Sequence, residues 1–190
     1  MNILDRAENL TNHFLIAMPG LADPNFYHTV TYMCDHNEEG AMGIVINRPL
    51  EMDLAELLSY LGVTDYPSEI GQVPIYQGGP VQTERGFVLH NPTGEWDATT
   101  HVSDQIDLTM SQDIIEAIAQ GRGPEQYLIS LGYAGWGKGQ LENELVENAW
   151  LNGPAQSDII FEQPVEQRWN ASARLLGVDI SQISHDVGHA

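Results

Sequence analysis

Short apolar runs separated by turn residues dominate the first half of the chain, and this pattern is typical of strands. Residues 13–18 form an apolar run that a Pro-Gly pair ends, which predicts a strand buried on both faces. Residues 28–35 are rich in β-branched and aromatic side chains, and after turn residues at 36–40 the apolar run at 41–46 completes a predicted hairpin. Alternation along the first hairpin strand places Val30, Tyr32 and Cys34 on one face, and Thr29, Thr31 and Met33 on the other.

Longer segments, with apolar residues every three to four positions, predict helices. Asp53 is a suitable N-cap for a helix over residues 53–62, and a second helix is expected over residues 111–121. Two further helices are predicted over residues 140–147 and 165–176. The inward face of the last one consists of Trp169, Ala173 and Leu176.

The remaining apolar stretches are too short for helices. We predict strands over residues 73–77, 86–90, 105–110 and 126–131, and a short extended piece that begins at Trp150. Because the strands cluster in hairpins and do not alternate regularly with helices, the sequence predicts an α+β fold with a mixed, largely antiparallel sheet. We expect residues 1–190 to form one domain, with a flexible tail at residues 181–190, where apolar side chains are few.

Charge is the most unusual global property of the chain. The sequence has 27 acidic residues against 7 basic ones, for a net charge of -20. Nucleic-acid binding depends on Lys and Arg that neutralise phosphates, so we expect no direct contact with nucleic acid and none with an anionic membrane. No apolar run is long enough to span a bilayer, no signal peptide is recognisable, and Cys34 is the single cysteine. We therefore expect a cytoplasmic protein whose partner is another protein or a small molecule, in an oligomeric state that the sequence leaves open.

The glycine-rich segment at residues 132–138 matches the first seven positions of a nucleotide-binding P-loop. Gly139 occupies the eighth position, where Ser or Thr would supply a hydroxyl to Mg²⁺, and acids such as Glu142 would repel a triphosphate. We therefore assign no nucleotide cofactor and interpret the glycines as a tight strand-to-helix crossing. As an alternative, backbone N–H groups at the helix start, flanked by Tyr133 and Trp136, bind a small ligand.

The best candidate for nucleophilic chemistry is the pair Cys34 and His36. They lie two positions apart on a predicted strand, so their side chains are expected to point to the same side. A thiolate nucleophile also needs a third, orienting group, and none is evident, so we interpret Cys34 as a buried structural cysteine. The histidines form no helical i,i+4 pair and no Cys-x-x-Cys motif is present. We assign no catalytic residues and no metal site.

Asn47, Arg48 and Pro49 place a cation at the exit of a strand. Arg48 either clamps a ligand carboxylate or ties down its own loop by pairing with an acid of the chain. We favour the structural pairing, because acids are abundant and arginines few. The Gly-Gly-Pro segment at residues 78–80 predicts a turn.

Taken together, several of these segments resemble the bacterial YqgE/AlgH family. The matching stretches are FLIAMP at 14–19, GIVINRP at 43–49, GGPV at 78–81, GYAGWG at 132–137, QLE at 140–142 and the ending GHA at 188–190. The resemblance implies a compact α+β domain with a small, barrel-like, branched sheet surrounded by helices. The family is described as uncharacterised, or as transcriptional regulators through a link to alginate production, and it implies no catalytic residues. Its glycine pattern does not demand the lysine at position 138, which further weakens the P-loop interpretation.

Our leading hypothesis is a non-enzymatic binding or regulatory protein that acts through a protein or small molecule. The rival is an enzyme that uses Arg48 and Glu142 around a bound small molecule, and a third hypothesis is direct regulation of DNA. The candidate binding surface consists of Asn47, Arg48, Pro49, Gly78, Gly79, Pro80, Tyr133, Gly135, Trp136, Gly139, Gln140 and Glu142.

Overall fold

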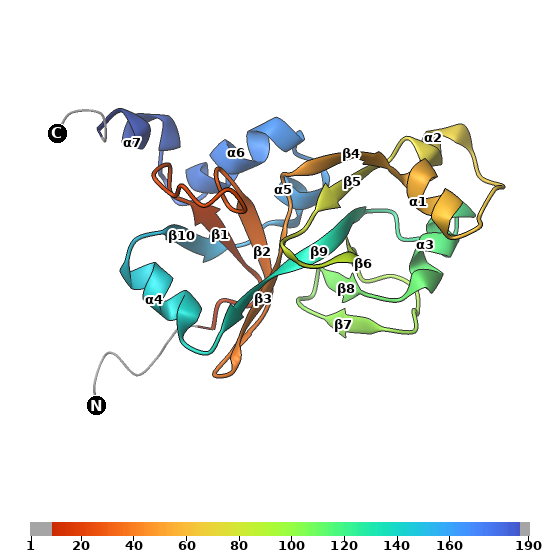
Figure 1. The fold of residues 1–190 in the computed structure, drawn as a ribbon, viewed down its shortest axis with the longest axis horizontal. Coiled ribbons are helices and arrows are strands. Elements are labelled where there is room, and N and C mark those ends of the chain that lie inside the picture. Colours follow the sequence, from red (N-terminus) through yellow and green to blue (C-terminus); the bar gives the residue numbers. More distant parts are fainter. Residues whose placement is uncertain (1–8, 187–190) are drawn as a thin grey trace.

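A curled, ten-stranded sheet organises the chain, and the computed structural model describes residues 9–186 of it (Figure 1). The strands are β1 (His13–Ala17), β2 (Val30–Asn37), β3 (Gly40–Val45), β4 (Pro49–Asp53), β5 (Pro74–Gln77), β6 (Val81–His90), β7 (Thr99–His101), β8 (Asp107–Thr109), β9 (Tyr127–Gly137) and β10 (Trp150–Pro154). The helices are α1 (Leu54–Tyr60), α2 (Ser68–Gly71), α3 (Gln112–Ala119), α4 (Gln140–Val146), α5 (Ser157–Phe161), the 3-10 helix η1 (Val165–Gln167), α6 (Arg168–Arg174) and α7 (Ile180–Asp186). Helices α1 to α3 gather at one end of the molecule, and α4, α6 and α7 at the other.

The sheet branches at β9. The last residues of β9 pair antiparallel with β3, whereas its first part lies between β6, which is antiparallel, and β5, which is parallel. The main path runs β10-β1-β2-β3-β9-β6-β8-β7, and β4 joins through β5 alone. The predicted α+β fold with a largely antiparallel, branched and barrel-like sheet is confirmed.

Apolar side chains on the two faces of the sheet form separate clusters. The first cluster includes Val30, Tyr32 and Cys34, which pack toward α5 and α6, whereas Met33 belongs to a cluster beside α4. This division confirms the predicted alternation along β2. A further cluster packs α1 and α3 against β5, β6 and β9.

Most of the predicted helices form where they were expected. Asp53 caps α1, because its carboxylate accepts a hydrogen bond from the Glu56 N–H at 3.2 Å. The helix predicted at 165–176 is present as η1 followed by α6, with Ala173 buried and Trp169 and Leu176 partly buried beside it. The extended piece from Trp150 is β10.

The structure also differs from the expectations. The strands β4 and β7 and the short helices α2 and α5 were not predicted, because each is only three to five residues long and carries no clear periodicity. No helix was predicted at residues 181–186, which belong to α7, and the flexible tail stays a prediction. The ending at residues 187–190, including the family-like GHA, lies outside the described residues.

The glycine-rich segment requires the largest correction. It was interpreted as a loop between strand and helix, but β9 continues through it to Gly137. A P-loop geometry is therefore absent from residues 132–138. The predicted helix at 140–147 is confirmed as α4, and Gly139 caps its start in the left-handed conformation, with φ 74°.

A buried histidine at the end of β6 makes stability depend on pH. His90 is fully buried; its Nδ1 donates to the Asn91 carbonyl at 2.7 Å, and its Nε2 lies 2.7 Å from Thr109 Oγ1. Burial lowers the pKa of His90 below the ordinary 6.5. The unfolded chain therefore binds more protons than the folded one just below pH 6.5, and the free energy of unfolding falls as the pH drops through that range.

We expect His90→Gln to reduce this pH dependence. The measurement is urea unfolding at several values between about pH 7.5 and 5.5, where histidines titrate. The wild type should lose more stability across this interval than the variant, whereas His13→Gln, in β1, should follow the wild type. An unchanged slope in His90→Gln would show that His90 does not control this response.

Candidate functional site

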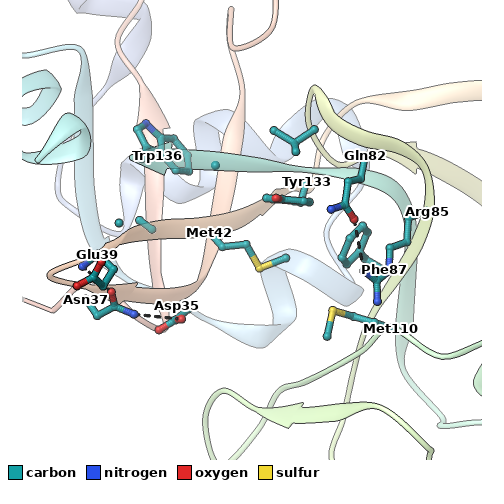
Figure 2. Close-up of a pocket in the computed structure, with 14 residues that line it drawn as sticks. Asp35, Asn37, Glu39, Met42, Gln82, Arg85, Phe87, Met110, Tyr133 and Trp136 are labelled. Atoms are coloured by element: carbon teal, nitrogen blue, oxygen red, sulfur yellow. Dashed lines mark hydrogen bonds between the residues drawn. The ribbon is translucent and has the colours of Figure 1, made fainter. Parts of the chain in front are cut away.

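A groove of about 580 Å³ opens between the β2–β3 hairpin, β6 and β9 (Figure 2). Its apolar floor consists of Met42, Phe87, Met110 and Tyr133. Its polar rim includes Asp35, Asn37, Glu39, Gln82 and Arg85. We call this hollow the groove; its volume lies within the range of about 300–1,000 Å³ that is usual for ligand sites.

The aromatic part of the floor is held by ring contacts. The rings of Phe87 and Tyr133 pack edge to face with centroids 5.5 Å apart. The Arg85 guanidinium lies over Phe87, 5.7 Å from the ring centroid, and donates to Gln82 Oε1 at 3.4 Å. Because Phe87 is in the middle of β6 and Tyr133 in β9, antiparallel pairing of these strands fixes the floor.

The two ends of the groove carry opposite charges. Figure 2 shows Asp35 and Glu39 at the hairpin end and Arg85 at the other, with Met42 between them. The hairpin end is ordered by a bond from Asn37 Nδ2 to Asp35 at 3.4 Å and one from the Glu39 N–H to Asn37 Oδ1 at 2.8 Å. A ligand that spans the groove would therefore meet acid at one end and a cation at the other.

An irregularity in β2 aims Asp35 into the groove. The pairing of β2 with β3 shifts between Met33 and Asp35, which is a β-bulge at Cys34. The bulge reverses the alternation, so the expectation that Cys34 and His36 share a side is wrong. Cys34 packs in the first cluster, whereas His36 contacts Leu10 on the opposite face.

The contacts of Cys34 and His36 are structural. Burial raises the pKa of the Cys34 thiol far above its ordinary value, and its Sγ lies 3.7 Å from the Tyr32 carbonyl, which confirms the buried structural cysteine. His36 Nδ1 accepts from the Leu10 N–H at 3.0 Å, so its Nε2 carries the proton and donates to Glu142 at 2.7 Å. This hydrogen bond lowers the pKa of Glu142. Glu142 therefore anchors α4 to β2.

The predicted site residues at 47–49 fasten a connection between strands. The side chain of Asn47 accepts from the Val30 N–H and donates to the His28 carbonyl, both at 2.9 Å. Arg48 donates to the carbonyls of Asn25 at 2.6 Å and Tyr27 at 3.0 Å. The expectation that Arg48 pairs with an acid is wrong: it ties down the loop through backbone carbonyls, and no ion pair of Arg48 occurs within residues 9–186.

Pro49 and the segment at 78–80 are also structural. Pro49 begins β4, and residues 78–80 connect β5 to β6, as the predicted turn requires. Gly78 donates to the Leu131 carbonyl and accepts from the Val45 N–H, both at 2.8 Å. A Cβ on Gly79 would lie 2.1 Å from the backbone carbon of Tyr133, so only glycine allows this close approach to β9.

The remaining predicted residues divide between the groove and α4. Tyr133, Gly135 and Trp136 line the groove, although the Trp136 ring is buried and stacks on Phe26 at 5.9 Å. Gln140 accepts from the Gly137 N–H at 3.0 Å and thus joins Gly139 in starting α4. Neither Arg48 nor Glu142 lines the groove, and no hydrogen bond or ion pair joins them in the described part of the chain. The structure does not assemble the active site of the rival hypothesis.

Sequence reasoning missed most of the groove. Met42, Phe87 and Met110 were assigned to ordinary strands, and Arg85 lay outside the strand predicted at 86–90. The signal for Arg85 was present but weak: it ends a run of four polar residues, which only Gly86 separates from the buried end of β6. Residues 9–186 contain no group of three or more His, Cys, Asp or Glu side chains placed to hold a metal ion. No helix in this range has the length and apolarity needed to cross a membrane.

Comparisons with known proteins give one consistent result. The family model described as AlgH-like (DUF179) matches residues 14–181. A UPF0301 protein of Nitrosococcus oceani is 57% identical over 179 residues, covering 94% of this chain and 96% of its own. One from Thioalkalivibrio sulfidiphilus is 54% identical, covering 97% and 98%.

Solved structures agree with the sequence comparisons. The solution structure of the AlgH protein from Pseudomonas aeruginosa is 50% identical, with a TM-score of 0.80 and complete coverage of both chains. A crystal structure of a Corynebacterium diphtheriae protein is 18% identical with a TM-score of 0.74, covers 95% of this chain and 94% of its own, and shares the fold. The match of the family model over most of the chain and the identities above one half establish that this chain belongs to the AlgH-like family.

Proposed function

We propose that this chain is a non-catalytic binding protein and that the groove is its binding surface. The observation that carries the proposal is an apolar floor, open to solvent, between ends of opposite charge. Exposed apolar hollows rimmed by polar groups are typical of binding sites, and methionines such as Met42 and Met110 adapt to ligands of different shape. The expected occupant is a small organic molecule or a short segment of a partner protein.

The chemistry of the lining favours binding over catalysis. Among residues 9–186, those that line the groove include no Ser, Thr, Cys, His or Lys, and the groups there that can carry a proton are the carboxylates of Asp35 and Glu39 and the phenol of Tyr133. His36 lies between the groove residues Asp35 and Asn37 in the sequence. Its ring, however, forms hydrogen bonds with Leu10 and Glu142 on the other face of β2. The groove thus supplies apolar area and charge but few groups for acyl or phosphoryl transfer.

The proposal includes a cytoplasmic location and a regulatory role that is exerted without direct contact with DNA. The net charge of -20 opposes the approach of a phosphate polymer. Internal contacts also occupy two of the few cations, because Arg168 is buried and Arg48 donates to backbone carbonyls. A regulatory signal would then pass through whatever occupies the groove.

Fragment binding followed by NMR tests the proposal. A library of small aromatic and aliphatic fragments is expected to shift the amide signals of Met42, Phe87 and Tyr133 in a saturable way. Met42→Ala should weaken binding about fivefold, since truncation removes roughly 1 kcal/mol of apolar contact. The matched control is Met52→Ala, because Met52 is also partly buried but packs in the cluster around α1 and α3.

Two results would count against the proposal. One is a set of fragment-induced shifts that lies away from the groove. The other is robust turnover of nucleotides, esters or phosphoesters that Met42→Ala abolishes and Met52→Ala leaves intact, which would make the groove an active site.

A further inference from the structure

A second hollow lies on the other side of Arg85 from the groove. This cleft, of about 260 Å³, opens between α1, α3 and the strands β6 and β9. Its walls are aliphatic and consist mainly of Leu57, Leu61, Val88, Ile115 and Leu131. Unlike the groove, it has no aromatic side chain in its lining within residues 9–186. The cleft therefore suits an unbranched alkyl chain better than a planar ring.

Arg85 stands where the two hollows meet. It lines both the groove and the cleft, and so does Met110. Within residues 9–186 no carboxylate forms an ion pair with Arg85, although the chain has 27 acidic residues. Its contacts are the Phe87 ring and the Gln82 amide, so the guanidinium retains donors for an anion.

The backbone that carries Arg85 departs from regular strand pairing where the groove and the cleft meet. Pairing of β6 with β9 is interrupted between Val81 and Gly86, and the intervening residues are exposed. Gln82 within this bulge has a φ of 47°, a left-handed conformation that is costly for a residue other than glycine. Such strain is common at ligand sites, where the surrounding structure maintains it.

We propose that the cleft binds the alkyl chain of an aliphatic carboxylate while Arg85 binds its carboxylate group. A cleft of 260 Å³ accommodates a chain of roughly eight carbons, because a methylene group occupies a volume similar to the ~30 Å³ of a water molecule. Glu84 also lines the cleft and disfavours a second negative charge, so the ligand is expected to be a monoanion. This inference goes beyond the function proposed for the groove, since it needs no occupant there.

Titration with sodium octanoate, followed by methyl NMR, tests the inference, with 1-octanol as the neutral probe of equal chain length. Both probes should shift the methyl signals of Leu57, Leu61 and Ile115, with dissociation constants of about 1 mM or weaker. Octanoate should bind about threefold more tightly than octanol, which is the scale expected of an exposed ion pair. Arg85→Gln should abolish this preference, and the matched Arg174→Gln, on α6, should keep it.

A second variant tests the alkyl site separately. Leu61→Trp places a larger side chain at the edge of the cleft and should weaken both probes, whereas Leu175→Trp, at an exposed position after α6, should not. Met42→Ala in the groove should leave octanoate binding unchanged, which distinguishes failure of this inference from failure of the function proposed above. Absence of saturable shifts in the cleft, or equal responses of Arg85→Gln and Arg174→Gln, would overturn the inference.

Discussion

Replacing Gly79 by alanine is expected to destabilise the protein by about 4 kcal/mol or more, near the upper end of single substitutions. The added Cβ would lie 2.1 Å from the carbonyl carbon of Tyr133 and 2.3 Å from the backbone nitrogen of Ala134. Both are atoms of the central strand β9, so no side-chain rotation relieves the overlap. The φ of 155° at Gly79 adds backbone strain for any residue with a side chain.

Urea unfolding measures this effect, and recovery of folded protein supports it when the variant is too unstable to titrate. The matched control is Gly20→Ala, because a Cβ at Gly20 meets nothing within 4 Å. That change should alter the free energy of unfolding by no more than about 0.5 kcal/mol. A Gly79→Ala protein as stable as the control would mean that the connection at residues 78–80 does not approach β9 as closely as described here.

Arg168→Ala is the second large effect, with an expected loss of about 3 kcal/mol. Arg168 is only 6% exposed, donates to the carbonyls of Ile46 and Gln163, and lies over the Tyr76 ring at 5.2 Å. Alanine would leave two carbonyls without this donor and remove the packing of the long side chain. Because Ile46 directly precedes the connection at 47–49, the contact also holds α6 against that end of the sheet.

The comparison that isolates this contribution uses Arg174→Ala at the exposed end of the same helix. Both variants remove one positive charge, so the long-range effect of charge cancels between them. Urea unfolding should show a difference of at least about 2 kcal/mol between the two variants. Equal stabilities would indicate that the loss in Arg168→Ala came from charge alone.

Local chemistry in the sequence was sufficient to predict the hairpin, the capped helix and the class of fold. Alternation along β2 assigned Val30, Tyr32 and Met33 to their faces, because a strand of period two leaves little choice once both faces are buried. The pattern failed after Cys34, because the bulge at this residue shifts the register. A bulge depends on pairing with a distant strand, so nothing local reveals that Asp35 turns toward the groove.

Tertiary contacts also determine the conformation of the glycine-rich segment at residues 132–138. Gly132 and Gly135 favour a loop by local propensity, yet β9 passes through both because strands on either side supply its hydrogen bonds. The candidate site was identified only in part for the same reason. Tyr133 was chosen as an aromatic residue of the glycine-rich segment, whereas Phe87 and Arg85 reach the groove through strand pairing that spans much of the chain.

The position of β9 in the chain has a consequence for biosynthesis. Its three partners, β3, β5 and β6, all precede it, so each emerges from the ribosome before the strand that completes it exists. Until translation passes residue 137, the nascent polypeptide carries unprotected strand edges that invite association with other chains. Folding of this domain is therefore a late event in synthesis. A truncated chain that ends before residue 127 lacks β9, the strand that joins β3 to β5 and β6.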